Sequence, residues 1–290
     1  MTAPAPDVEG LAWEGSVLRL ENDLAVARVA LQGAQVLTYA PRGGAPVLWL
    51  SRRAVFAPGK AVRGGIPVCW PWFGPHPTDP SKPAHGFART AIWTLEAASR
   101  TTDGGHELVL SLPPRAGAAC GWTYPVELNL TITIGSALGL ALCSRNNGSA
   151  PVVIGGALHS YFSVGDVGKI RILGLEGKSF VDQLAPSETK SEPVPIGIAG
   201  ETDRVYDDPG PQSVIDDELL ARRIFIEKTG SRSTVVWNPW LEKGRRLADV
   251  GQDQVRDFVC VETANALKNV VTLPPGGEHR LGLVIRAEEY

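Results

Sequence analysis

The sequence lacks the features that identify membrane, secreted and nucleotide-binding proteins. No apolar run approaches the roughly 20 residues of a transmembrane helix, and the N-terminal segment MTAPAPDVEG has neither the basic nor the apolar part of a signal peptide. No GxGxxG or Walker-type phosphate loop is present, and no segment repeats at a fixed period. We therefore expect a cytoplasmic protein that does not bind membranes and does not use a nucleotide-binding fold.

Cysteine is scarce, and its spacing matches no metal or redox motif. The chain has four cysteines, at Cys69, Cys120, Cys143 and Cys260. They lie far apart without a CxxC pair, which excludes the usual zinc and redox patterns and is typical of reduced thiols in a cytoplasm. His76 and His85 could suggest a metal pair, but no carboxylate at ligand spacing supports one. We expect no bound metal.

An excess of positive charge is also missing. The chain has 28 lysine and arginine residues against 31 aspartate and glutamate residues, so its net charge is −3. A nucleic-acid-binding domain usually carries a basic face, and this balance therefore argues against nucleic acid as a partner. An anionic ligand would have to be attracted by a local group of cationic side chains.

Helix signals are few, whereas period-two alternation of apolar and polar residues is frequent. It is clearest over residues 126–134 and repeats over 138–142 after a turn at Gly135, which predicts a β-hairpin. Other strands are predicted over 16–31 (two strands around an Asn22–Asp23 turn), 35–39, 47–50, 92–97, 107–112, 154–164, 169–175, 223–228, 234–238, 258–262 and 279–286. Short helices are expected only within 215–222 and 244–253, and a loop over 182–200.

This pattern predicts an all-β protein built as a large antiparallel β-sandwich with very few short helices. The 32 glycines and 23 prolines are too few for a disordered chain and mark its turns. No linker is long enough to separate domains, and sandwiches of this length often form one unit. We expect residues 1–290 to form a single domain.

The most unusual stretch is residues 63–89, RGGIPVCWPWFGPHPTDPSKPAHGFAR. Proline removes a backbone donor and glycine weakens regular structure, so this stretch is expected to be a loop. Ordering a long loop costs backbone entropy, and long loops rich in aromatic residues are usually held in place for binding. The alternative is an aromatic plug that closes one end of the sandwich.

Several blocks of sequence, in order along the chain, carry a family resemblance. The loop contains RGGIPVCWPWFGP and leads through AHGFART to Trp93, and later blocks are LHSYF (158–162), TDRVY (202–206), WNPW (237–240) and FVCVETAN (258–265). Together they resemble the hexose-6-phosphate mutarotases (glucose-6-phosphate 1-epimerases) of the galactose-mutarotase-like group. The resemblance implies the galactose-mutarotase-like supersandwich fold and a monomer.

The resemblance also implies a reaction, which interconverts the α and β anomers of an aldohexose 6-phosphate such as glucose 6-phosphate at C1. The sugar ring opens, rotates about the C1–C2 bond and closes on its other face. This requires a base for the proton of the anomeric hydroxyl and an acid for the ring oxygen, and the two exchange roles on closure. The reaction needs no cofactor.

His159 and Glu262 are the candidate catalytic residues. His159 lies in the apolar segment GGALHSYFSV, on the face of Ala157 and Tyr161, where a histidine taken alone is more often structural. Glu262 lies at the end of an apolar strand, where burial of a carboxylate is costly unless it is paired or used. The resemblance implies that His159 is the acid and Glu262 the base.

Four further residues are candidate substrate ligands. Arg63 and Arg89 bracket the loop, and two such guanidinium groups suit a phosphate dianion because they form paired charge-assisted bonds, although each taken alone could be solvated. The resemblance implies that both bind the sugar phosphate, that Asp203 accepts bonds from sugar hydroxyls and that His85 lines the pocket. Some family members have Gln where this chain has Ala84, so only a backbone contact is expected there.

Two questions stay open at this point. The aromatic residues could line the sugar pocket or the core, and they include Trp70, Trp72, Trp237 and Trp240. The chain could also be a mutarotase of free aldoses, or a carbohydrate-binding sandwich without activity. A binding module would retain its ligand after Glu262→Gln and would not catalyse anomer exchange.

Overall fold

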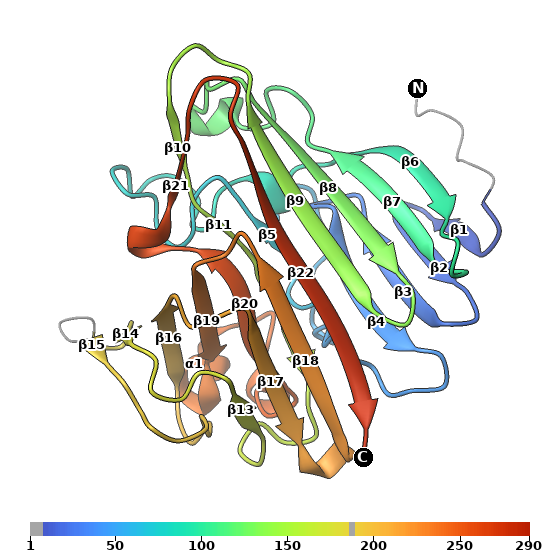
Figure 1. Cartoon of the computed structure of the whole chain (residues 1–290), viewed down its shortest axis with the longest axis vertical. Coiled ribbons are helices and arrows are strands. Elements are labelled where there is room, and N and C mark those ends of the chain that lie inside the picture. Colours follow the sequence, from blue (N-terminus) through green and yellow to red (C-terminus); the bar gives the residue numbers. More distant parts are fainter. Residues whose placement is uncertain (1–7, 186–188) are drawn as a thin grey trace.

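A computed structural model describes residues 8–185 and 189–290, whose strands form two large sheets and two small ones (Figure 1). The strand pairs in all four sheets are antiparallel. Within these residues there is one α-helix, α1 (Trp240–Arg246), and no helix that is long and apolar enough to cross a membrane. The predicted all-β antiparallel architecture with few short helices is confirmed.

The first large sheet, called the β22 sheet after its longest strand, contains eight strands. In spatial order they are β13 (Arg171–Leu173), β17 (Gln212–Asp217), β18 (Arg222–Thr229), β22 (Glu278–Glu289), β9 (Leu138–Asn146), β8 (Val126–Ile134), β7 (His106–Ser111) and β6 (Thr94–Arg100). The predicted hairpin of β8 and β9 is confirmed. Alternate residues of β8, including Leu130 and Ile132, are buried because successive side chains of a strand point to opposite faces.

The second large sheet, called the β20 sheet, carries the functional candidates. In spatial order it contains β15 (Thr189–Lys190), β14 (Phe180–Asp182), β16 (Thr202–Asp207), β19 (Ser233–Asn238), β20 (Phe258–Asn265), β11 (Gly156–Leu158) and β5 (Val68–Cys69), and β12 (Tyr161–Ser163) also pairs with β20. The small sheets contain β1 (Leu11–Glu14), β2 (Val17–Glu21), β3 (Ala25–Ala30) and β4 (Gln35–Pro41), and β10 (Val152–Ile154) with β21 (Val271–Leu273).

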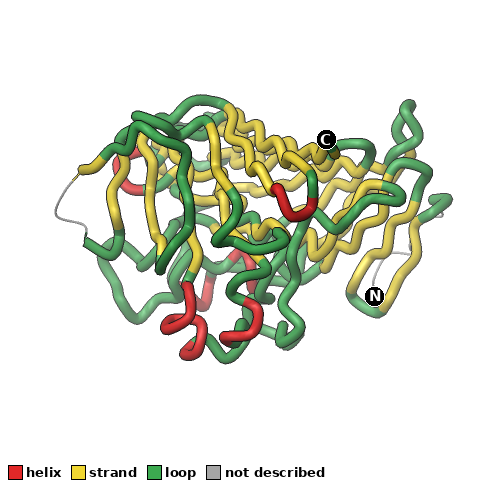
Figure 2. The backbone as a smooth tube through the Cα atoms, turned by 90° about the horizontal axis from the view of Figure 1, so that it is seen from below, coloured by secondary structure: helices red, strands yellow, loops and turns green. Residues whose placement is uncertain are grey.

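One hydrophobic core is shared by all four sheets. Leu20 of β2, Ile132 of β8, Val261 of β20 and Leu273 of β21 belong to the same buried cluster. The opposite face of β20, which carries Cys260, packs in a separate small cluster with Tyr161. Figure 2 shows the strands in stacked layers, with loops and short helical turns projecting below them. One face of β20 therefore packs in the main core, and the other face packs in the separate cluster.

Some local predictions are wrong, and each error involves a tertiary contact. Residues 47–50 form no strand, since Leu48 and Leu50 make only isolated bridges. The short helical turn expected within 215–222 is present only as a 3₁₀ turn at Glu218–Leu220, and the flanking residues belong to β17 and β18, because pairing with neighbouring strands overrides local preference. The strand predicted over 154–164 is broken into β10, β11 and β12.

The remaining differences concern short or irregular elements. The predicted loop over 182–200 contains the end of β14 and the two-residue β15, and its residues 186–188 lie outside the described residues, as do residues 1–7 of the N-terminal segment. The helix expected within 244–253 is represented by the end of α1 and a 3₁₀ turn that begins at Gln252. Sequence patterns gave no sign of β1, β16 or β21, which are short or irregular in their alternation.

Candidate active site

Strand β20 places Cys260 and Glu262 on the same face of its sheet, because residues two apart in a strand point in the same direction. Cys260 is paired with Tyr161 of β12 and Trp237 of β19, and Glu262 is paired with Val235 of β19. All eight residues of β20 are buried. Glu262 is thus a carboxylic acid set among apolar neighbours on the face that does not contribute to the main core.

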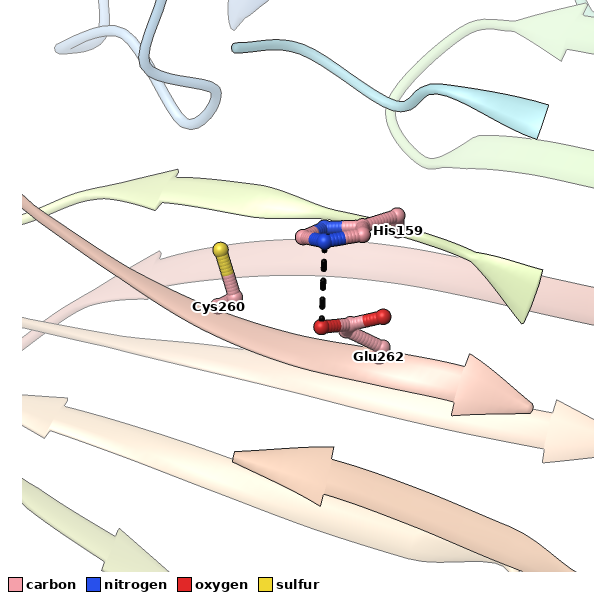
Figure 3. Close-up of side chains that lie close together, drawn as sticks. All are labelled: His159, Cys260 and Glu262. Atoms are coloured by element: carbon pink, nitrogen blue, oxygen red, sulfur yellow. Dashed lines mark ion pairs between the residues drawn. The ribbon is translucent and has the colours of Figure 1, made fainter. Parts of the chain in front are cut away.

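His159 lies at the break between β11 and β12, directly over Glu262 (Figure 3). Its Nε2 atom is 3.4 Å from Oε1 of Glu262, and its ring stacks on Tyr161 with 4.8 Å between ring centroids. The backbone N–H of His159 donates to the carbonyl of Pro67, so the long loop helps to fix this position. The structure therefore brings together the two residues predicted to be acid and base.

Only one edge of this pair reaches the surface. The His159 side chain is 10% exposed and the Glu262 side chain 1% exposed. The Nδ1 atom of His159 and the Oε2 atom of Glu262 have no hydrogen-bond partner among the described residues. Because buried polar atoms are normally satisfied, these two atoms mark a site that is built to meet another molecule.

Burial dominates the electrostatics of the pair. It raises the pKa of Glu262 well above its ordinary value, and the neighbouring Asp203 carboxylate acts in the same direction while Arg89 opposes it. It also lowers the pKa of His159 well below its ordinary value, with His85 and Arg89 adding to the effect. Both groups are driven toward their neutral forms, so at neutral pH the pair holds one dissociable proton that can occupy either Glu262 or His159.

The loop of residues 63–89 brings His85 to the same place. His85 has a positive φ of 64° although it is not glycine, and its backbone N–H donates to the carbonyl of Gly74. Its Nδ1 atom accepts from the Gly74 N–H at 3.3 Å, which leaves the proton on Nε2, and its ring lies 5.8 Å from that of His159. Burial lowers the pKa of His85 to about 3, so it is a neutral hydrogen-bond donor beside the pair.

A glycine makes this loop conformation possible. Gly86 has a φ of 72°, and a Cβ atom at this position would lie 1.9 Å from the carbonyl oxygen of Trp70. Only glycine combines the left-handed backbone with so close an approach of two chain segments. Gly86 therefore lets the end of the loop return against its beginning, and His85 is held in place as a result.

The two loop arginines are each held by part of their guanidinium group. Arg63 donates through Nε to Asp249 at 3.0 Å and through Nη1 to the hydroxyl of Tyr161 at 2.9 Å. Arg89 donates through Nη2 to the carbonyl of Ala84 at 2.7 Å, and its buried Nε has no partner within the described parts of the chain. Each guanidinium is thus oriented by some of its donors and keeps others for a ligand.

Asp203 completes the group from strand β16, which is separated from β20 by β19. It is paired with Trp237, which is in turn paired with Cys260, so the three side chains cross the sheet in one row. Burial raises the pKa of Asp203 to about 6, with Lys243 acting against the rise. All six predicted site residues therefore lie around the outer face of β20, and their roles in binding and catalysis remain predictions.

The question left open for the tryptophans has different answers for different residues. Trp70 and Trp72 belong to the main core, and their indole N–H groups donate to Ser144 and to the carbonyl of Pro83. Trp240 is partly buried against that core. Trp237 is different, since its ring lies 6.2 Å from that of His159. Two tryptophans of the loop thus pack in the core, whereas Trp237, which lies outside the loop on β19, is beside the site.

Sequence analysis missed three residues of the site. Tyr161 and Cys260 lie two residues from His159 and Glu262 on the same strand faces, and this spacing was a signal that could have identified them. Asp249, which binds Arg63, comes from the segment after α1 and carries no local signal. His76, considered as a metal ligand, instead accepts backbone N–H groups from Thr78 and Asp79 in its own turn.

A surface hollow of about 620 Å³ lies elsewhere, on the outer face of the β22 sheet. Its floor contains small residues, Gly139, Ala141 and Gly282, and threonine side chains lean across the glycines. None of the six predicted site residues lines it. Size alone would favour this hollow, but the buried acid–base pair on β20 is the better candidate for chemistry.

Comparison with known proteins first defines the fold class. A galactose mutarotase-like protein from Clostridium acetobutylicum superposes with a TM-score of 0.70 and 15% identity, covering 94% of this chain and 95% of that one. At that identity the likeness shows the fold alone. The YeaD protein of Salmonella typhimurium superposes more closely, with a TM-score of 0.88 and 32% identity over 94% of this chain and 90% of that one.

The sequence comparisons then give the family. A family model described as Aldose 1-epimerase matches residues 16–286, and the chain belongs to this family. An Escherichia coli K12 protein named "Putative glucose-6-phosphate 1-epimerase" is 38% identical over 243 residues, which is 83% of this chain and 80% of that protein. A protein of the same name from Cenchrus ciliaris is 33% identical and covers 90% of this chain and 81% of its own length.

Proposed function

We propose that this chain interconverts the α and β anomers of an aldohexose 6-phosphate, glucose 6-phosphate in the first instance, by ring opening and closure. The observation that carries the proposal is the buried pair of His159 and Glu262, 3.4 Å apart, with Arg63 and Arg89 beside it. The names of the relatives that share its sequence and fold support the choice of substrate.

In this proposal the pair supplies both proton transfers. Glu262, when ionised, takes the proton from the anomeric hydroxyl, while His159 donates a proton to the ring oxygen as the C1–O5 bond breaks. The open aldehyde rotates about its C1–C2 bond. On closure His159 takes back the proton of the C5 hydroxyl and Glu262 returns one to the new anomeric oxygen, so the enzyme ends as it began.

The surrounding residues hold the sugar for this chemistry. Arg63 and Arg89 bind the phosphate with the donors that their protein contacts leave free. His85 donates from Nε2 to a sugar oxygen, and Asp203 accepts from a sugar hydroxyl. The single exposed edge at His159 makes the sugar approach Glu262 from the histidine side.

The proposal is tested by saturation-transfer NMR of anomer exchange with glucose 6-phosphate and, in parallel, with free glucose. We expect faster exchange for the phosphate. Equal acceleration of both sugars would make the chain a mutarotase of free aldoses, and binding without acceleration of either would make it a carbohydrate-binding sandwich.

The rate constant kcat should have a bell-shaped pH profile with a wide plateau. The active pair carries one proton, and because burial lowers the pKa of His159 it gains a second only well below pH 6.5. Because burial raises the pKa of Glu262, the last proton is lost only well above pH 4.5. Anomer exchange measured by NMR at a series of pH values and at saturating glucose 6-phosphate tests this. Saturation removes the effect of titration of the free substrate's phosphate, which occurs at about pH 6.

A profile that falls with a midpoint at the ordinary histidine pKa of about 6.5 would contradict this expectation. The same series with Asp203→Asn serves as a control, because a fall caused by protonation of Asp203 near pH 6 would disappear in that variant. If the plateau of kcat persists in Asp203→Asn, its limits are set by His159 and Glu262.

Replacing Arg63 by alanine should raise KM for glucose 6-phosphate by about 10- to 100-fold, since charge-assisted hydrogen bonds contribute about 1.5–3 kcal/mol. Exchange of free glucose should change little. Because the substitution leaves Asp249 without Arg63, the double variant with Asp249→Asn separates loss of a phosphate ligand from an unpaired carboxylate. Arg52→Ala, an exposed arginine, is the matched control. Equal losses for both sugars would exclude a role for Arg63 in binding phosphate.

A further inference from the structure

Cys260 is a buried thiol of the site that the proposed reaction does not use. It lies beside the acid–base pair, and Figure 3 shows it on the same strand as Glu262 and next to the nitrogen edge of the His159 ring. One ligand atom from each of His159, Cys260 and Glu262 lies within 4.8 Å of the other two. Imidazole, thiolate and carboxylate are the three side-chain ligands that zinc takes in proteins.

We propose that His159, Cys260 and Glu262 form an inhibitory Zn²⁺ site. Zinc bonds of about 2.0–2.3 Å in a tetrahedron place ligand atoms about 3.3–3.5 Å apart. The 3.4 Å between Nε2 of His159 and Oε1 of Glu262 already matches this separation. The longest separation in the cluster, which is no more than 4.8 Å, needs to shorten by about 1.3 Å at most, and rotation of the side chains can supply this.

Two further observations distinguish this cluster from a chance grouping. Oε2 of Glu262 and Nδ1 of His159 are buried without hydrogen-bond partners among the described residues. These two polar atoms are therefore available to bind another group. The cluster is also not sealed from solvent, because the His159 side chain is 10% exposed.

The charges of the site balance on binding. Zinc takes a thiol as the thiolate and a carboxylic acid as the carboxylate, so Cys260 and Glu262 together neutralise the ion. Among the neighbours, Asp203 favours the cation, whereas Arg89 and Arg63 oppose it, and Arg63 is paired with Asp249.

Because zinc binds the deprotonated forms of these ligands, binding should tighten as the pH rises. The ion would occupy both groups that exchange protons with the sugar, so zinc should compete with the substrate. This last step rests on the proposed function, whereas the binding of the ion does not.

The test of binding uses Co²⁺ as a spectroscopic substitute for Zn²⁺. We expect one equivalent of Co²⁺ to produce a thiolate-to-metal charge-transfer band with the wild-type chain, and Zn²⁺ to remove it. The band should be absent in Cys260→Ala and Cys260→Ser, each checked for folding by circular dichroism. It should persist in Cys143→Ser, a control cysteine on the outer face of β9. A wild-type chain without the band, or a band that survives both Cys260 variants, would overturn the proposal.

The test of inhibition compares exchange of glucose 6-phosphate with and without Zn²⁺ in each variant. We expect the zinc concentration that halves the rate to rise more than about tenfold in Cys260→Ala and to stay unchanged in Cys143→Ser. Zinc that binds a catalytically active chain without slowing it would refute the inhibitory role. A chain that binds cobalt through Cys260 but never catalyses exchange would refute the proposed function and leave the metal site standing.

Discussion

Glu262→Gln should reduce kcat for anomer exchange of glucose 6-phosphate by about 10²- to 10⁴-fold, the range that a positioned general base contributes. Glutamine cannot accept the proton of the anomeric hydroxyl, although it keeps the shape of the side chain. Because burial drives Glu262 toward its neutral form, an amide also suits the electrostatics of the pocket, and the variant should fold. KM should change much less than kcat.

Two comparisons separate this loss from a structural one. Glu262→Asp retains the carboxylate but withdraws it by one methylene, and a displacement of this size costs about 10²-fold in a well-oriented reaction. Glu227→Gln, which changes a glutamate paired with Arg286 on the β22 sheet, should leave exchange unaffected. If Glu262→Gln retained wild-type exchange, the base would be another residue, and the assignment of both proton transfers to His159 and Glu262 would be wrong.

The roles of His159 and Glu262 are linked through strand register. Residues of β20 alternate between the main core, as Val261 does, and the site, as Cys260 and Glu262 do. A shift of the β20 register by one residue would point Glu262 into the apolar core. The pairing of Tyr161 with Cys260 and of Val235 with Glu262 therefore fixes the position of the base as firmly as any contact of its carboxylate.

The sequence could predict the parts of the fold that depend on local alternation. β8 and β9 were predicted as a hairpin because apolar and polar residues alternate over β8 and leucines recur at every second position at the start of β9. The same pattern failed over 154–164, where regular pairing is interrupted: it predicted one strand where the structure has three. The interruption at His159 is set by the loop, whose Pro67 carbonyl accepts the His159 N–H, and this contact cannot be read from either segment alone.

The candidate site was predictable only in part for the same reason. Sequence blocks identified His159 and Glu262, and the structure brings them within 3.4 Å. Asp249 could not be predicted, since it meets Arg63 across 186 positions in the sequence. Cys260 was set aside because cysteine spacing along the chain suggested no metal, whereas metal ligands need only be close in space. Long-range pairing therefore supplied what local patterns could not.

His159→Gln should also reduce kcat by about 10²- to 10⁴-fold, because no proton would reach the ring oxygen as the sugar opens. His159 has a structural contact as well, since its ring stacks on Tyr161, whose hydroxyl accepts from Arg63. Loss of that contact alone would disturb Arg63 and raise KM for the phosphate substrate. Tyr161→Phe is the matched control, because it removes the bond to Arg63 and keeps the aromatic ring.

The two variants should therefore change different kinetic parameters. We expect His159→Gln to lower kcat for glucose 6-phosphate and glucose alike, and to lose the alkaline limb of the pH profile, since no histidine remains to hold the proton that is lost there and the remaining base, Glu262, only has to be ionised. Tyr161→Phe should raise KM for the phosphate and leave the alkaline limb in place. A His159→Gln variant that changed only KM, as Tyr161→Phe does, would mean that the histidine positions Arg63 through Tyr161 and that the acid must be sought in His85, the other imidazole of the site.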